Sequence, residues 1–270
     1  MSKLYKLGVI GNPIEHSLSP FIHSRFARNE KIPALYKAYK VDEGSFNIFI
    51  KEFFSSNESL GLNVTLPFKK LASELDGEIT KEAKKISAVN TIKKNKRILE
   101  LGSTDGIGFI DDLRSKDISL NQKEVLIIGA GGASESILFK IIAESPKKIY
   151  ISNRTTSKAE ALIDKYKDLY KDMHILEQGN KPCPDIIING SSAGLTGGFN
   201  PIDIKASKDS VFYDLNYSLE TTPFCEWSLE KSSRVFDGMG MLVNQAAYSF
   251  NIWFGIMPET QKVIVDLRSL

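Results

Sequence analysis

The sequence has little cysteine: only Cys183 and Cys225 occur among its 270 residues, and they form no CxxC pair. This low cysteine content disfavours a secreted protein stabilised by disulfide bonds and fits a reducing compartment. No apolar run approaches the ~20 residues that a membrane-spanning helix needs. The residues after Met1 lead directly into a strand-like pattern, without the apolar core or cleavage site of a signal peptide, so we expect a cytoplasmic protein.

An excess of charge of one sign is also missing, because 35 Lys and Arg residues face 33 Asp and Glu residues and leave a net charge of +2. That balance is too small to indicate nucleic acid or an acidic membrane as a partner. The basic residues Lys93, Lys94, Lys96 and Arg97 have no interleaved aromatic side chains. We expect them to lie in a solvated turn.

Histidine is scarce as well, with His16, His23 and His174 as its three occurrences. Neither they nor the cysteines show the close spacings that bind zinc, so we expect no metal site. We expect His23 and His174 to be structural or surface residues, whereas His16 either packs a turn or touches substrate. A Walker-type phosphate loop is absent too, which disfavours chemistry on nucleoside triphosphates.

Short β-rich runs alternate with helical patterns along most of the chain, which predicts an α/β fold with parallel sheets. The predicted strands cover residues 7–10, 36–41, 62–65, 125–128, 148–152, 185–188 and 211–213. The predicted helices begin at residue 20, with Ser19 as the N-cap, and then cover residues 46–53, 133–143, 158–169, 239–254 and 259–267. We infer two domains that meet near Asp105.

A glycine-rich turn, Gly129-Ala130-Gly131-Gly132-Ala133, follows a buried-type strand and opens a helix. Glycines at such a turn let the backbone approach a pyrophosphate, which then lies at the helix N-terminus. A site for NAD usually has an acidic residue about 20 positions later, bonded to the ribose 2′-hydroxyl. Here that place reads Ser152-Asn153-Arg154-Thr155, with Lys158 beyond it. The missing acid and the two cations favour NADP.

A competing motif, Gly190-Ser191-Ser192-Ala193-Gly194, matches the nucleophile elbow of serine hydrolases and follows a strand. In that fold the histidine of the triad comes after the serine, whereas all three histidines of this chain precede Ser192. The hydrolase interpretation therefore fails. We expect Ser191 and Ser192 to form a compact turn near the cofactor.

Polar residues recur at the ends of the predicted strands of the first domain, where open α/β sheets bind their ligands. They are Ser17, Ser19, Asn63, Thr65 and Lys69, then Asn90, which we expect to end a third short strand, and Asp105. Ser17 and Ser19 lie beside a helix N-terminus, where hydroxyl groups and the helix dipole can receive a carboxylate.

These polar residues belong to motifs that resemble those of the shikimate dehydrogenase family, in the family's order over nearly the whole chain. The motifs are Gly8-Val9-Ile10-Gly11-Asn12-Pro13, His16-Ser17-Leu18-Ser19-Pro20, Asn63-Val64-Thr65-Leu66-Pro67-Phe68-Lys69, Ala88-Val89-Asn90-Thr91, Thr104-Asp105-Gly106, Asn153-Arg154-Thr155 and Asp237-Gly238-Met239-Gly240-Met241-Leu242-Val243-Asn244-Gln245-Ala246. The resemblance implies NADP-dependent interconversion of 3-dehydroshikimate and shikimate, in aromatic amino-acid biosynthesis.

The resemblance also implies roles for single residues. Lys69 and Asp105 would be the catalytic pair, and Ser17, Ser19, Asn63, Thr65, Asn90, Asp105, Tyr217 and Gln245 would line the substrate pocket. The cofactor would be held by Gly129, Ala130, Gly131, Gly132, Ala133, Asn153, Arg154, Thr155, Lys158, Leu215 and Gly238. Residues 1–104, with the returning helices of 238–270, would form an α/β substrate domain. Residues 105–237 would form a doubly wound parallel (Rossmann) domain for NADP.

Three residues depart from the family's pattern. Glu135 stands where many members have arginine and adds a negative charge near the bound phosphates. Ser103 replaces a usual asparagine beside Asp105, and Lys158 replaces a common arginine, which keeps the charge but loses the planar fork. Two other functions stay open, a quinate/shikimate dehydrogenase and a non-catalytic NADP-binding regulatory protein. The expected assembly is a monomer or a homodimer.

Overall fold

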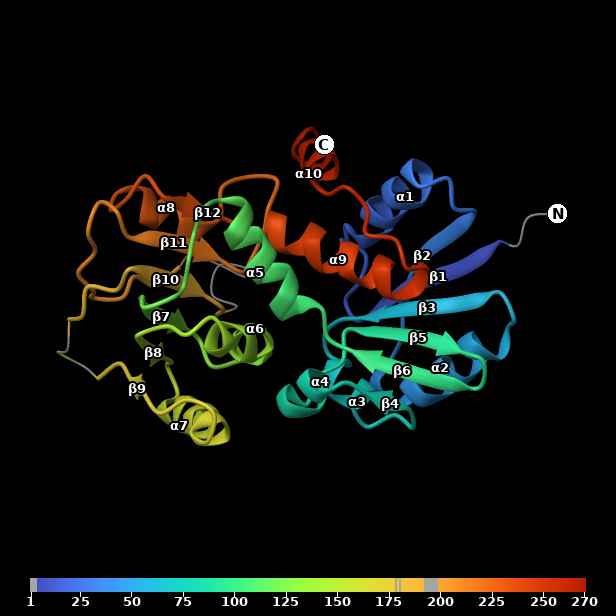
Figure 1. Cartoon of the computed structure of the whole chain (residues 1–270), viewed down its shortest axis with the longest axis horizontal. Helices are drawn as coiled ribbons and strands as arrows, with labels where there is room; N and C mark the ends of the chain where they lie inside the picture. Colours follow the sequence, from blue (N-terminus) through green and yellow to red (C-terminus); the bar gives the residue numbers. More distant parts are fainter. Residues whose placement is uncertain (1–3, 178, 180, 192–198) are drawn as a thin grey trace. The chain divides into compact units, whose positions relative to one another are not determined.

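The computed structural model describes residues 4–177, 179, 181–191 and 199–270, which divide into two compact units (Figure 1). Unit 1 takes in Met1–Gly108 and Val243–Ser269, and unit 2 takes in Phe109–Leu242. The chain passes between the units inside the helices α5 (Asp105–Ser115) and α9 (Met239–Phe254). The boundaries expected from the sequence, after residues 104 and 237, therefore lie a few residues before these divisions.

Unit 1 is built on a six-stranded sheet with the order β2-β1-β3-β5-β6-β4. Its strands are β1 (Tyr5–Gly11), β2 (Ala34–Lys40), β3 (Ser59–Val64), β4 (Glu78–Ile79), β5 (Thr91–Asn95) and β6 (Ile98–Gly102). The strand β1 pairs in parallel with β2 and β3, but β5 is antiparallel to both β3 and β6. The expectation of a parallel sheet therefore holds only in part for this unit, because β5 runs antiparallel between β3 and β6.

The helices of unit 1, besides its parts of α5 and α9, are α1 (Ser19–Asn29), the 3₁₀ turn η1 (Glu43–Ser45), α2 (Phe46–Ser55), α3 (Lys69–Ala72), α4 (Lys81–Ile86) and α10 (Gln261–Arg268). The helix α2 buries Phe46, Ile50, Phe53 and Phe54 in a core shared with Leu62 of β3, because these residues repeat at helical spacing. A second cluster joins Tyr36 of β2 to Trp253 of α9. Both clusters pack against β3, and the polar residues gather at its carboxyl end.

Unit 2 is built on an entirely parallel six-stranded sheet with the order β12-β11-β10-β7-β8-β9. Its strands are β7 (Glu124–Ile128), β8 (Lys148–Ser152), β9 (Met173–Ile175), β10 (Ile186–Asn189), β11 (Val211–Asp214) and β12 (Val235–Phe236). Its helices are α6 (Gly132–Ala143), α7 (Thr156–Tyr166) and α8 (Pro223–Leu229). Along the chain, β8 and β9 are added on one side of β7, and β10, β11 and β12 are then added on its other side. This is the strand order of a doubly wound fold. The predicted fold class is confirmed.

Two local expectations are wrong. Ser19 is the first residue of α1 and not its N-cap, which is Leu18, with no side-chain capping bond. Asn90 precedes β5 and does not end a strand. Because β5 runs antiparallel to β3, its amino end still lies at the carboxyl end of β3, beside Asn63.

The basic residues expected in a solvated turn separate into two pairs. Lys93 and Lys94 belong to β5 and are partly buried. The Lys93 Nζ donates to the carbonyl of Ile252 at 2.6 Å, and the Lys94 Nζ donates to the carbonyls of Phe54 and Ser56 at 2.6 and 3.0 Å. Lys96 and Arg97 are exposed at the hairpin turn, as expected.

The motif at 190–194 lies mostly outside the described residues, which include only Gly190 and Ser191 of it. The expected turn at Ser192 therefore lies outside them as well. Among the described residues no helix is long and apolar enough to cross a membrane. No group of three or more potential metal ligands occurs in the described ranges either.

Candidate active site

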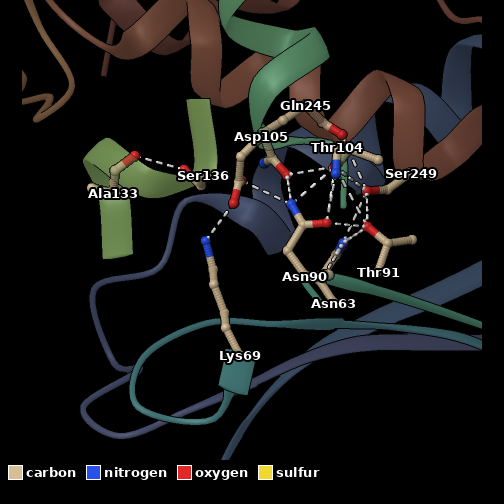
Figure 2. Close-up of polar contacts among 10 residues, drawn as sticks. All are labelled: Asn63, Lys69, Asn90, Thr91, Thr104, Asp105, Ala133, Ser136, Gln245 and Ser249. Carbon is tan, nitrogen blue, oxygen red and sulfur yellow. Dashed lines mark hydrogen bonds and ion pairs between the residues drawn. The ribbon is translucent and has the colours of Figure 1, made fainter. Parts of the chain in front are cut away.

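The centre of the polar cluster in unit 1 is an ion pair between Lys69 and Asp105 (Figure 2). Lys69 begins α3 and Asp105 begins α5, and the Lys69 Nζ lies 2.7 Å from the Asp105 Oδ2. The side chain of Asp105 is 8% exposed and that of Lys69 is 27% exposed. The carboxylate is therefore buried within the unit, while the Lys69 side chain is partly exposed.

The other carboxylate oxygen of Asp105 is held by Asn90, whose Nδ2 donates to the Asp105 Oδ1 at 2.8 Å. The Asn90 Oδ1 accepts a hydrogen bond from the backbone N–H of Thr104 at 2.9 Å. Because a backbone N–H can only donate, this bond fixes the orientation of the carboxamide and turns its NH₂ group toward Asp105. Both oxygens of Asp105 thus have a fixed donor before any ligand binds.

Helix α9 contributes Gln245 and Ser249 to the same cluster. The Gln245 Oε1 accepts from the Asn90 Nδ2 at 3.3 Å. One turn later, the Ser249 Oγ lies 2.7 Å from the Thr91 Oγ1 and accepts from the Asn63 Nδ2 at 3.0 Å. The segment carrying α9 is far from the others in sequence, yet it completes their hydrogen bonds within unit 1.

Asn63 extends the cluster toward the aromatic residues behind it. The Tyr36 hydroxyl donates to the Asn63 Oδ1 at 2.8 Å, and burial raises the pKa of Tyr36 well above its ordinary value, against the opposing effect of Ser19. His23 stacks on Tyr36 with ring centroids 4.3 Å apart. Burial lowers the pKa of His23 to about 3, so its ring is neutral at physiological pH.

The remaining predicted substrate residues lie around this cluster or in the other unit. The Ser17 Oγ accepts from the backbone N–H of Ser19 at 3.3 Å, where α1 begins, and both residues are partly exposed. Thr65 follows β3 and is partly exposed. Tyr217 belongs to unit 2, where burial raises its pKa.

Four residues that the sequence did not single out take part in the cluster: Tyr36, Thr91, Thr104 and Ser249. Thr91 and Thr104 stand inside the quoted motifs, directly beside Asn90 and Asp105, so adjacency could have found them. Ser249 follows Gln245 by four positions and shares its helix face. Ser103 takes no part, because its Oγ is buried without a hydrogen-bond partner among the described residues.

In unit 2, the glycine-rich turn joins β7 to α6 at the centre of the parallel sheet. Gly129 has φ +99°, a conformation that favours glycine. A Cβ atom at Gly131 or Gly132 would meet nothing within 4 Å, so the space over the N-terminus of α6 is open. An open helix N-terminus with bare backbone N–H groups fits a pyrophosphate.

The end of β8 lies next to this turn and is tied to it by Asn153. The Asn153 Oδ1 accepts from the Ala130 N–H at 3.0 Å, and its Nδ2 donates to the Thr155 carbonyl at 2.8 Å. Arg154 and Lys158 are exposed, and neither forms an ion pair with any residue that the structure describes. These two cations, Arg154 after β8 and Lys158 in the first turn of α7, fit the 2′-phosphate of NADP.

Glu135 pairs with Lys165 of α7. This pairing offsets the negative charge that the sequence places near the turn.

The segment that follows β11 completes the predicted cofactor residues. The Gly238 N–H donates to the Asn216 carbonyl at 2.9 Å, and a Cβ atom at Gly238 would lie 2.4 Å from the Leu215 carbonyl oxygen. Glycine at 238 therefore allows the two segments to touch. Within unit 2 the structure brings Leu215 and Gly238 together at the same sheet edge as the glycine-rich turn.

Comparisons with known proteins cover most of the chain. Family models match residues 9–92 (shikimate dehydrogenase substrate binding domain), 112–195 (shikimate / quinate 5-dehydrogenase) and 238–264 (shikimate 5′-dehydrogenase C-terminal domain). The chain is 40% identical over 264 residues to the shikimate dehydrogenase (NADP(+)) of Colwellia psychrerythraea, covering 97% of this chain and 95% of that protein. It is 39% identical to the one of Legionella pneumophila, covering 98% and 99%.

Solved structures resemble the chain over its whole length. An Ael1 enzyme from Pseudomonas putida has a TM-score of 0.89 and 32% identity, covering 97% of this chain and 98% of that one. Shikimate 5-dehydrogenase from Thermus thermophilus, in complex with NADP(H) and shikimate, has a TM-score of 0.88 and 25% identity, covering 98% and 99%.

Proposed function

This chain belongs to the shikimate dehydrogenase family, and we propose that it catalyses the reversible NADP-dependent reduction of 3-dehydroshikimate to shikimate, a step of aromatic amino-acid biosynthesis. The observation that carries the proposal is the ion pair of Lys69 and Asp105, which Asn90 fixes and in which the Lys69 side chain is partly exposed. A protein that only binds NADP needs no such pair. The chain is therefore an oxidoreductase in this proposal, and not a regulatory binding protein.

NADP, when bound, supplies the hydride chemistry. The residues of the chain supply binding, orientation and proton transfer. We assign the proton at the reacting hydroxyl to Lys69, whose Nζ donates it in the reducing direction and must be deprotonated to accept it in the other. Asp105 orients the Lys69 ammonium and the substrate hydroxyl, because its own two oxygens are already fixed by Lys69 and Asn90.

Ser17 and Ser19 are assigned to the substrate carboxylate, because they lie at the start of α1, where the helix dipole favours a negative charge. Asn63, Thr65, Asn90, Tyr217 and Gln245 are assigned to the remaining substrate groups. The small side chains of Ser17 and Ser19 favour shikimate over the bulkier quinate. We further propose a cytoplasmic monomer or homodimer with neither nucleic acid nor membrane as a partner.

The test is the absorbance of reduced nicotinamide when the purified protein receives shikimate or quinate, each with NADP or NAD. We expect rapid reduction with shikimate and NADP and much slower reduction in the other three combinations. Equal kcat/KM for shikimate and quinate would favour the quinate/shikimate alternative. Binding of NADPH without turnover of either acid would favour the non-catalytic one.

A further inference from the structure

A buried carboxylate in unit 2, that of Asp214, has no part in the assignments above. Asp214 ends β11 and is 1% exposed. Its Oδ1 accepts from the Asn189 Nδ2 at 2.9 Å and from the backbone N–H and the Nδ2 of Asn216, both at 3.0 Å. Its Oδ2 accepts from the Thr222 hydroxyl at 2.7 Å. Four donors thus converge on one carboxylate, which no lysine or arginine of the described ranges pairs with.

The donors come from the carboxyl end of β10, which carries Asn189, and from the segment after β11, which carries Asn216 and Thr222. Asn189 ends β10, and its backbone carbonyl accepts from the Leu215 N–H at 2.8 Å. Asn216 follows β11, and its Nδ2 also donates to the Ser191 carbonyl at 3.0 Å, while its own carbonyl accepts from Gly238 beyond β12. Asp214 and Asn216 therefore hold the segment around Leu215 against Gly238 on one side and Ser191 on the other.

The strand order shows which half of a dinucleotide these segments would meet. The glycine-rich turn follows β7, and Arg154 follows β8 on one side of it. The segments after β10, β11 and β12 lie on the opposite side of β7. A dinucleotide bound across this edge has its pyrophosphate at β7. With its 2′-phosphate toward β8, its nicotinamide half must lie toward β10 and β11.

We propose that Asp214 is a positioning residue for the nicotinamide half of NADP, acting through Asn216 and the segment that joins Leu215 to Tyr217. The proposal rests on the proposed function, because it requires NADP at the glycine-rich turn. Burial raises the pKa of Asp214, and the hydrogen bonds from Thr222, Asn216 and Asn189 oppose this rise because they favour the ionised form. Hydrogen bonds to an ionised acceptor are the strong and directional ones, so a carboxylate fixes its donors more firmly than a neutral group would. Burying this carboxylate is costly unless it is fully hydrogen-bonded, as it is here.

The experiment compares the binding of two probes by titration calorimetry, NADPH and adenosine 2′,5′-bisphosphate, which lacks the nicotinamide half. Asn216→Ala removes the side-chain donor and leaves the backbone N–H bond to Asp214. We expect it to raise the Kd for NADPH roughly 5- to 30-fold, as the loss of one or two hydrogen bonds implies. The Kd for adenosine 2′,5′-bisphosphate should stay within about twofold, and the KM for NADP should rise more than kcat falls.

Two sets of variants serve as controls. Asn121→Ala, at an exposed position of the same unit, should leave both probes unchanged. Thr222→Val removes the donor to the Asp214 Oδ2 and also the N-cap acceptor for the Cys225 N–H of α8, whereas Thr222→Ser keeps both. Only the valine variant should weaken NADPH binding, and its Kd for adenosine 2′,5′-bisphosphate should stay unchanged if the loss is confined to the nicotinamide half. The Thr222 pair decides the question if Asn216→Ala fails to fold.

The failure of this inference differs from the failure of the proposed function. If the wild-type protein binds neither probe, the proposed function is wrong and the inference falls with it. If the wild type binds both probes and the Asn216 and Thr222 variants bind NADPH equally well, only the inference is overturned. Equal weakening of both probes would also overturn it, because it would show a general structural effect.

Discussion

At the scale of the residue, the chemistry depends on the exchangeable proton of Lys69. We predict that Lys69→Ala lowers kcat by roughly 10²- to 10⁴-fold, the usual contribution of a positioned acid–base group. Lys69→Arg should also be slow, because it keeps the positive charge beside Asp105 but does not give up a proton at working pH. The measurement is steady-state kinetics with shikimate and NADP, with NADPH binding as the control for folding. Near-normal turnover of the alanine variant would exclude Lys69 as the proton mediator.

His23 couples the stability of unit 1 to pH. Burial lowers its pKa from 6.5 to about 3, so between these values the unfolded chain binds a proton that the native chain does not. The contribution of the neutral ring is therefore complete above pH 6.5 and is lost as the pH falls toward 3, by at most about 1.4 kcal/mol per pH unit.

His23→Phe should make the free energy of unfolding less dependent on pH in this range, because it keeps the aromatic stacking on Tyr36 and removes the titrating ring. Urea unfolding at several pH values measures the slope. His174→Phe, at an exposed position, is the matched control and should keep the wild-type slope. An unchanged slope in the His23 variant would mean that other groups cause the acid sensitivity.

At the scale of the element, a lysine in one strand supports the end of a neighbouring helix. The carbonyls of the last turn of a helix have no hydrogen-bond donor within the helix. At the end of α2, the Lys94 Nζ donates to the carbonyls of Phe54 and Ser56. Lys94→Met keeps the apolar stem and removes the donor. We predict a loss of about 1 kcal/mol in the free energy of unfolding.

Chemical denaturation of three proteins measures this loss: the wild type, Lys94→Met and Arg97→Met. Arg97 is exposed at the hairpin turn, so its replacement should change the stability by less than about 0.5 kcal/mol. If the two variants were equally stable, the bonds from Lys94 would contribute nothing to α2.

Apolar patterns predicted many of the strands and helices, but not the β5–β6 hairpin or the shortest strands. The strand at 125–128 was predicted because its four residues form a continuous apolar run, and the helix at 239–254 was predicted from its helical pattern. The hairpin of β5 and β6 was missed because Lys93 and Lys94 made its first strand look solvated. Charged groups that bond to backbone carbonyls cannot be told from surface charges by composition. The two-residue strands β4 and β12 are too short to show any period.

At the scale of the whole molecule, the cluster around Asp105 depends on contacts that no local pattern records. Asn63 and Ser249 are separated by 186 positions, and their hydrogen bond exists only because part of α9 belongs to unit 1. The motifs identified Asn63, Asn90 and Gln245 through their resemblance to a family. They could not show that the Thr104 N–H fixes the carboxamide of Asn90, because that requires the folded backbone.

Binding of NADP should stabilise the whole chain by mass action, since a ligand that binds only the native state adds RT ln(1 + [L]/Kd), or about 2.7 kcal/mol at 100 Kd. NAD, at the same concentration, should raise the Tm less, because it lacks the phosphate that Arg154 is placed to bind. Arg154→Ala should therefore bring the Tm shift with NADP down to that with NAD. Arg234→Ala, beside the amino end of β12 in the same unit, should leave the difference intact. Thermal unfolding of the three proteins with each cofactor measures these shifts. An undiminished preference for NADP in Arg154→Ala would place the 2′-phosphate elsewhere.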